Sequence, residues 1–190
     1  HHRYLHSFPT RRSSDLAVHE TCHAYTYAMA YVLLPDGERA FGREPYSAFC
    51  LEAGANAIVR RTPVFPSAEM AAEFPQQLRT LRFSPYIWPS QANLTTQVFG
   101  VYGLLDELTA YYHGTRTSLD LLEFYKTEAA QTRENWFSFF GGIYANYCAY
   151  PEFKLYILKY LRYAQAKYPQ IYRQVLENRE FTRSEERRVG

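Results

Sequence analysis

The residues best suited to chemistry form one short run, His19-Glu20-Thr21-Cys22-His23, which has the pattern H-E-x-x-H. On a helix, residues four apart lie one above the other on the same face, so the imidazoles of His19 and His23 can share one Zn²⁺ ion. Glu20 lies beside them, where its carboxylate can take a proton from a metal-bound water. Two histidines one turn apart in an otherwise apolar helix are costly to bury without such a partner. The run therefore predicts a zinc site.

A third ligand must come from another segment, because a catalytic zinc site normally has three protein ligands and one position open to water. No further histidine follows His23 at short spacing, so acidic residues on other expected helices are the candidates. Glu107 lies in the run LLDELTAYY and Glu52 in the run LEAGAN. Asn56, one turn after Glu52, is suited to orient a ligand histidine from behind. The residues alone leave Glu107 and Glu52 as alternatives.

The motif followed by a helical glutamate resembles the gluzincin group of zinc metallopeptidases. In many aminopeptidase-like members the third ligand lies in a segment of the type N-E-G-x-A-x-Y, and the run DELTAYY around Glu107 is similar to it. This chain departs from the pattern at Leu108, where the family often has glycine, and in the longer separation between His23 and Glu107. The resemblance covers only these two segments. It implies a zinc site made of His19, His23 and Glu107, with Glu20 as the catalytic residue.

The activity that the resemblance implies is hydrolysis of a peptide bond in a peptide or protein substrate. The metal polarises the scissile carbonyl, while Glu20 deprotonates the water and later passes that proton to the leaving amine. Tyr111 and His113 are further candidates, as donors to the oxyanion of the tetrahedral intermediate. Ordinary packing is the competing interpretation of both, since the chain contains eighteen tyrosines. Cys22 is expected to be a small buried side chain off the metal face.

The motif requires a helix, and residues 17–34 contain no proline or glycine before Pro35-Asp36-Gly37 ends the run. Alternating strand patterns are nearly absent, and no hairpin is expected. The expected fold class is mainly α, the helical portion of a zincin-like metallopeptidase domain whose N-terminal sheet part is missing. Further helices are expected over residues 46–61, 67–81 (kinked at Pro75), 93–113, 118–147 (broken near Gly141-Gly142), 151–166 and 169–178.

The two ends of the chain are related to each other at the level of codons. Residues 183–190 read RSEERRVG, and one set of codons for them has a reverse complement that encodes PTRRSSD in the next frame, followed by the start of a leucine codon. Residues 9–16 read PTRRSSDL. This resembles translated sequencing adapter, so we interpret residues 1–16 and 183–190 as adapter-derived and residues 17–182 as the fragment of a domain.

Composition limits the remaining function classes. Without six arginines and three acidic residues in the two ends, the formal net charge changes from +2 to −1, so no nucleic-acid partner is expected. With 47% hydrophobic and 17% aromatic residues, the chain suits one domain with a sizeable core. No apolar run approaches the length of a membrane span, and three cysteines are too few for a disulfide scaffold or a zinc ribbon.

Two further expectations concern whether this chain is catalytically active. The resemblance implies that the strands lining the substrate cleft precede the motif helix, so residues 17–182 alone are expected to bind zinc without robust turnover. The alternative function is a non-catalytic helical interaction domain. Its zinc site would be structural, closed by a fourth protein ligand, or lost.

Overall fold

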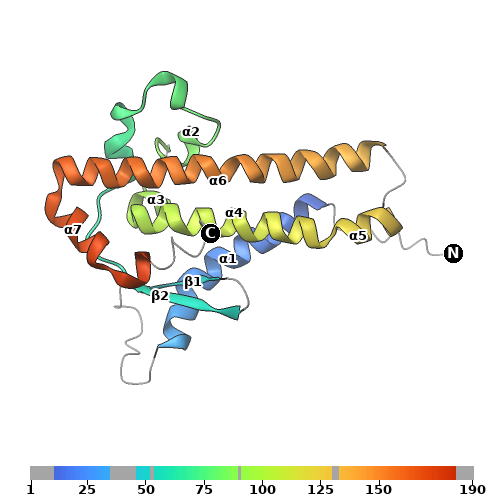
Figure 1. Cartoon of the computed structure of the whole chain (residues 1–190), viewed down its shortest axis with the longest axis horizontal. Helices are drawn as coiled ribbons and strands as arrows, with labels where there is room; N and C mark the ends of the chain where they lie inside the picture. Colours follow the sequence, from blue (N-terminus) through green and yellow to red (C-terminus); the bar gives the residue numbers. More distant parts are fainter. Residues whose placement is uncertain (1–10, 35–45, 52–53, 90, 130–132, 183–190) are drawn as a thin grey trace.

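The computed structural model describes residues 11–34, 46–51, 54–89, 91–129 and 133–182. Two of its three long helices run side by side, and the third runs obliquely to them (Figure 1). The three are α1 (Arg11–Leu33), α4 (Val101–Asp120) and α6 (Arg133–Lys167). The central helix is α4, which contacts α1 on one side and α6 on the other. The predicted mainly α fold class is therefore confirmed.

The motif helix is α1, as predicted. It begins at Arg11, so part of the segment interpreted as adapter is helical, and it ends at Leu33, shortly before Pro35. The face toward the molecule carries Thr26 and Ala30, whose exposed fractions are 1% and 0%. The opposite face is exposed, because an amphipathic helix at the surface buries only one stripe of side chains.

An antiparallel pair of strands replaces the helix predicted over residues 46–61, so that prediction was wrong. Strand β1 (Tyr46–Cys50) pairs with β2 (Asn56–Arg60), with Ala48 opposite Ile58. Side chains along β2 alternate between buried and more exposed positions, which is the period of two that a strand requires. Gly54, in the connection, has a φ of 75°, a backbone conformation that glycine adopts at little cost. The sheet packs on α1 mainly through β1.

Glycine also determines where α4 begins. The single helix predicted over residues 93–113 is divided into α3 (Thr95–Val98) and α4, and α4 continues past Gly114 to Asp120. Gly100 separates them with a φ of 52°, which L-residues with a Cβ seldom adopt. A Cβ at Gly100 would also lie 2.8 Å from the carbonyl oxygen of Phe65. The junction between α3 and α4 therefore depends on glycine.

The longest helix, α6, runs without interruption through Gly141 and Pro151, where breaks were predicted. Buried residues on both sides of the proline, Ala149 and Phe153, hold the two halves against the rest of the core. The helices predicted over residues 118–147 and 151–166 are thus largely one element, preceded by α5 (Leu122–Phe124) and the π-helical turn η5 (Tyr125–Ala129). Helix α7 (Pro169–Glu177) follows with proline in its first turn, as predicted.

A crossing segment joins the sheet to α3, and its described residues form short turns of helix. They are η3 (Ser67–Glu73), η4 (Gln76–Leu78) and α2 (Phe83–Tyr86). Pro75 separates η3 from η4, in agreement with the kinked helix predicted there.

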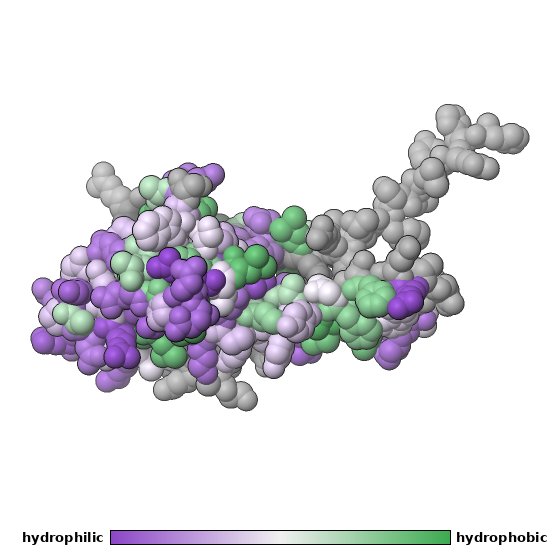
Figure 2. Space-filling view, turned by 90° about the horizontal axis from the view of Figure 1, so that it is seen from above, coloured by the Kyte–Doolittle hydropathy of each residue, from purple (hydrophilic) through white to green (hydrophobic). Residues whose placement is uncertain are grey.

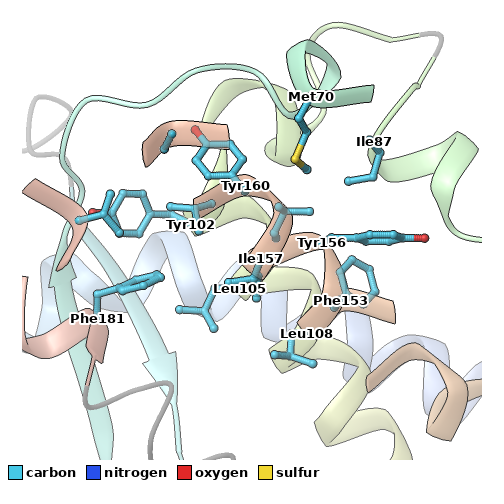
Figure 3. Packing of buried hydrophobic residues seen from close by; sticks show 14 of the residues in the cluster. Met70, Ile87, Tyr102, Leu105, Leu108, Phe153, Tyr156, Ile157, Tyr160 and Phe181 are labelled. Carbon is cyan, nitrogen blue, oxygen red and sulfur yellow. The ribbon is translucent and has the colours of Figure 1, made fainter. Parts of the chain in front are cut away.

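Aromatic side chains from α4 and α6 form much of the core, as Figure 3 shows for Tyr102, Phe153, Tyr156 and Tyr160. The hydroxyl of Tyr160 donates to the carbonyl oxygen of Phe65 at 2.7 Å, so even its polar atom is paired inside the core.

The surface on the α6 side is not uniform. Apolar side chains are exposed in the half of the molecule where α6 begins, and Phe137 and Phe140 there are 65% and 58% exposed (Figure 2). Within the described ranges, every helix is too short or too polar to cross a membrane.

Candidate metal centre

Three of the predicted site residues converge between α1 and α4. His19 and His23 are one turn apart on α1, and their Nε2 atoms lie 3.0 Å from each other. Each of these nitrogens lies 3.6 Å from Oε2 of Glu107, which projects from α4. The helix periodicity places the two imidazoles on one face, and the contact between α1 and α4 supplies the carboxylate. The predicted ligand group is therefore assembled in the structure.

The size of this group fits a metal ion. A point equidistant from the three ligand atoms lies about 2.0 Å from each of them, which matches Zn–N bonds of ~2.0–2.1 Å and Zn–O bonds of ~2.0–2.2 Å. Oε2 of Glu107 is buried and has no hydrogen-bond partner among the described residues, an arrangement that is costly unless a cation satisfies it. Two imidazoles and one carboxylate suit zinc, and they also suit other transition metals.

The electrostatics of the group depend on its burial and on its neighbours. Burial and the nearby His23 lower the pKa of His19 to about 4. Burial also acts to lower the pKa of His23, but the hydrogen bond and the charge of Asp106 outweigh it and raise that pKa to about 9. Burial raises the pKa of Glu107 to about 7, although the charge of His23 opposes the shift. A cation that binds here must therefore displace a proton from His23.

A second layer of side chains orients His23. Its Nδ1 lies 2.7 Å from Oδ2 of Asp106, which is fully buried, and this pairing leaves Nε2 directed at the ligand group. The hydroxyl of Tyr27 donates to the same carboxylate oxygen at 3.1 Å. Asn56, which was predicted as a residue suited to orient a ligand histidine, instead accepts a hydrogen bond from Tyr25 at 2.5 Å. The sequence feature that pointed to Asp106 was its position directly before Glu107, which places two carboxylates next to each other.

The remaining predicted residues lie around the group in different ways. Glu20 is exposed on α1, and its negative charge acts to raise the pKa of His19, His23 and Glu107. Cys22 is not a member of the ligand group. Glu52, the alternative third ligand, lies outside the described residues.

Tyr111 and His113 have different surroundings. The Tyr111 ring packs edge-on against His19, with ring centroids 4.7 Å apart. Its hydroxyl oxygen lies 3.0 Å from that of Tyr86, a residue that was not predicted to lie near the site. His113 instead joins α4 to the sheet, because its Nε2 lies 3.0 Å from the carbonyl oxygen of Cys50.

Comparison of the chain with protein-family models, with curated proteins and with solved structures gives no match. The evidence for the chemistry of this site therefore comes from its own residues and their geometry.

Proposed function

We propose that this chain is a zinc-dependent hydrolase that acts on peptide bonds, with His19, His23 and Glu107 as metal ligands. The observation that supports the proposal is the number of ligands. Among the described residues the group contains three side chains and no fourth, which is the composition of a catalytic zinc site. The side chains of His19 and His23 are 14% and 19% exposed, so part of each imidazole reaches the surface.

Each residue has a distinct part in the proposed reaction. Zinc held by the three ligands supplies a Lewis acid, which polarises a carbonyl group and lowers the pKa of water. Glu20, next to His19 in the sequence and exposed to solvent, accepts a proton from the attacking water on its carboxylate and delivers it to the leaving amine. Asp106 keeps the Nδ1 proton on His23 and thereby fixes the ring.

The competing function is a helical interaction domain whose zinc site is structural or lost. A structural site is closed by four protein ligands and leaves no position for water or substrate. The three-residue group favours the catalytic interpretation, because Cys22, the nearest cysteine in sequence, is not part of it.

The proposal is tested first by metal content and by access to the metal. Elemental analysis of the purified chain should give about one zinc per chain, and much less in Glu107→Ala. After exchange with Co²⁺, acetohydroxamate should change the visible absorption spectrum, because an open coordination position accepts a new ligand. One metal per chain with no response to hydroxamate would favour the structural site. Absence of metal from the folded wild-type chain would contradict the hydrolase and favour an interaction domain with a lost site.

The role of Glu20 is tested by hydrolysis of a fluorogenic peptide mixture. Glu20→Gln should abolish the zinc-dependent rate at unchanged zinc content, whereas Glu73→Gln, an exposed glutamate on η3, should leave it unchanged. A low absolute rate is sufficient, because the variants are compared with the wild type. Equal rates in Glu20→Gln and wild type would show that Glu20 is not the base.

A further inference from the structure

The two histidines of the metal group are held in different ways. Nδ1 of His23 pairs with the carboxylate of Asp106 at 2.7 Å, whereas no carboxylate among the described residues pairs with Nδ1 of His19. The χ2 torsion of a histidine has broad minima, so an imidazole without such a partner needs packing to fix its direction. The ring that packs against His19 from another helix is that of Tyr111 on α4, with centroids 4.7 Å apart and planes at 78°. This edge-to-face arrangement is one that aromatic rings prefer.

The Tyr111 ring is itself held by contacts with two other side chains. Cζ of Arg82 lies 4.7 Å from the ring centroid, within the range of a cation–π interaction, and Arg82 is buried, which strengthens such an interaction. The guanidinium is fixed from α6, because Nη1 lies 2.6 Å from Oε2 of Glu152 and Nη2 donates to the carbonyl oxygen of Ala145 at 2.7 Å. Phe153, also on α6, packs against the Tyr111 ring with centroids 5.4 Å apart. Contacts from α6 therefore fix the ring that packs against the metal group.

The hydroxyl group of Tyr111 has a partner in the core as well. Its oxygen lies 3.0 Å from the hydroxyl oxygen of Tyr86. Tyr86 is fixed by a buried polar network, in which its carbonyl oxygen accepts hydrogen bonds from Oγ of Ser67 at 2.9 Å, Oγ1 of Thr96 at 2.8 Å and Nε2 of Gln97 at 3.1 Å. Buried polar networks that are fully paired hold a unique conformation. The hydroxyl of Tyr111 is therefore paired with a side chain whose own place is fixed.

We propose that Tyr111 is a positioning residue of the metal centre, whose ring holds the His19 imidazole so that Nε2 faces His23 and Glu107. The ring is the part that matters, because it makes the contact with His19 and receives the two contacts from α6. The hydroxyl has a secondary part, since the ring contacts remain when its hydrogen bond to Tyr86 is removed. The inference deepens the proposed metal site and rests on it, but it does not depend on hydrolysis.

The test separates the ring of Tyr111 from its hydroxyl group. Tyr111→Phe removes only the hydroxyl, and Tyr111→Leu removes the ring but keeps an apolar side chain. The control for a general loss of core packing is Phe74→Leu, because the buried Phe74 ring packs against Phe83 and Tyr156 in another part of the core. Zinc affinity is measured by competition with a chelator, and the Co²⁺-loaded chains are compared by visible absorption.

We expect Tyr111→Leu to bind zinc roughly 10–100-fold more weakly than wild type, as for other residues that orient a metal ligand. Its Co²⁺ spectrum should change as well, because the His19 ring is free to turn. Tyr111→Phe and Phe74→Leu should retain the affinity and spectrum of wild type, although Phe74→Leu lowers the Tm. The inference is wrong if Tyr111→Leu binds zinc as wild type does, or if either of the other two variants loses as much affinity as Tyr111→Leu.

A measurement on the wild type tests the same contact without any substitution. In the zinc-loaded chain, nuclear Overhauser effects should connect the ring protons of His19 with those of Tyr111, whose centroids lie 4.7 Å apart. Their absence from the folded, zinc-loaded chain would overturn the inference even if Tyr111→Leu failed to fold.

Failure of this inference and failure of the proposed function give different results. A wild-type chain that binds zinc but shows no Glu20-dependent hydrolysis contradicts the function alone, and weaker binding by Tyr111→Leu still supports the inference. Glu20-dependent hydrolysis by the wild type, together with unchanged zinc affinity in Tyr111→Leu, contradicts the inference alone. A wild-type chain that binds no metal overturns both.

Discussion

Replacing Gly103 by alanine tests whether a close approach of two backbones fixes the helix that carries Glu107. Gly103 lies in the first turn of α4, four residues before Glu107 and therefore on the same helix face. A Cβ at Gly103 would lie 2.7 Å from the backbone nitrogen of Thr96, and closer still to the carbonyl group of Thr95. Since these atoms are backbone, α3 or α4 must move to make room.

The expected change in the free energy of unfolding is the difference between two opposing effects of the added methyl group. Overpacking of this kind costs about 3 kcal/mol where no flexible side chain can yield. Alanine is about 1 kcal/mol better than glycine in a helix, which offsets part of that cost. Gly103→Ala should therefore lower the free energy of unfolding by about 2 kcal/mol. For a chain of this length the loss corresponds to a fall in Tm of roughly 4–8 °C.

Thermal and urea unfolding of the wild type, Gly103→Ala and Gly141→Ala measure the change in the free energy of unfolding. The matched control is Gly141→Ala in α6, where a Cβ would meet nothing within 4 Å, and which should gain about 0.5–1 kcal/mol. Zinc affinity should fall in Gly103→Ala and not in Gly141→Ala, because only the first substitution displaces the turn that holds Glu107. A Gly103→Ala chain as stable as wild type would refute the reasoning.

Three more results are expected. Asp106→Asn should weaken zinc binding roughly 10–100-fold in a chelator competition, because His23 loses its carboxylate partner; a change below threefold would count against that role. Burial raises the pKa of Tyr156 to about 12, so the stability tied to its neutral form is complete below pH 10 and lost as the pH rises through 12. Because the chain has eighteen tyrosines, the phenolate of Tyr156 is read from the absorbance difference between wild type and Tyr156→Phe; it should appear only where circular dichroism is lost, and a Tyr156 phenolate near pH 10 with the fold intact would contradict this. Pro151→Ala should raise the urea midpoint by an amount equivalent to about 2 kcal/mol, because α6 regains a helical N–H, and an unchanged midpoint would argue against it.

The parts of the site that sequence could predict are those set by local geometry. The spacing of His19 and His23 needs only a helix to bring the imidazoles together, and α1 provides it. The residues alone left Glu107 and Glu52 as alternatives, and only the resemblance of the run DELTAYY to a gluzincin segment favoured Glu107. The packing of α1 on α4 is what brings Glu107 to the histidines.

The features that sequence did not reveal depend on distant contacts or on competing local preferences. Tyr86 is one of eighteen tyrosines, and its place beside Tyr111 depends on a buried network of side chains from η3 and α3. The strands are only five residues each, and the run of residues 46–60 contains four alanines, which favours a helical interpretation. The pair Ile58-Val59 and Gly54 were the signals for a hairpin. Pro151 was taken as a helix boundary, but buried neighbours on both sides keep α6 continuous.

The position of the ligands along the chain gives the metal centre a consequence for folding. The hydrogen bond between His23 and Asp106 joins residues 83 positions apart. An ion bound at the centre would close nearly the same loop through its coordination bonds to His23 and Glu107. Closing a loop of this length removes conformational entropy from the unfolded chain, much as a disulfide does. Among its described side chains α1 buries only Thr26 and Ala30 completely, so hydrophobic contact alone holds it weakly. The ion would then act as the cross-link that keeps the N-terminal helix docked.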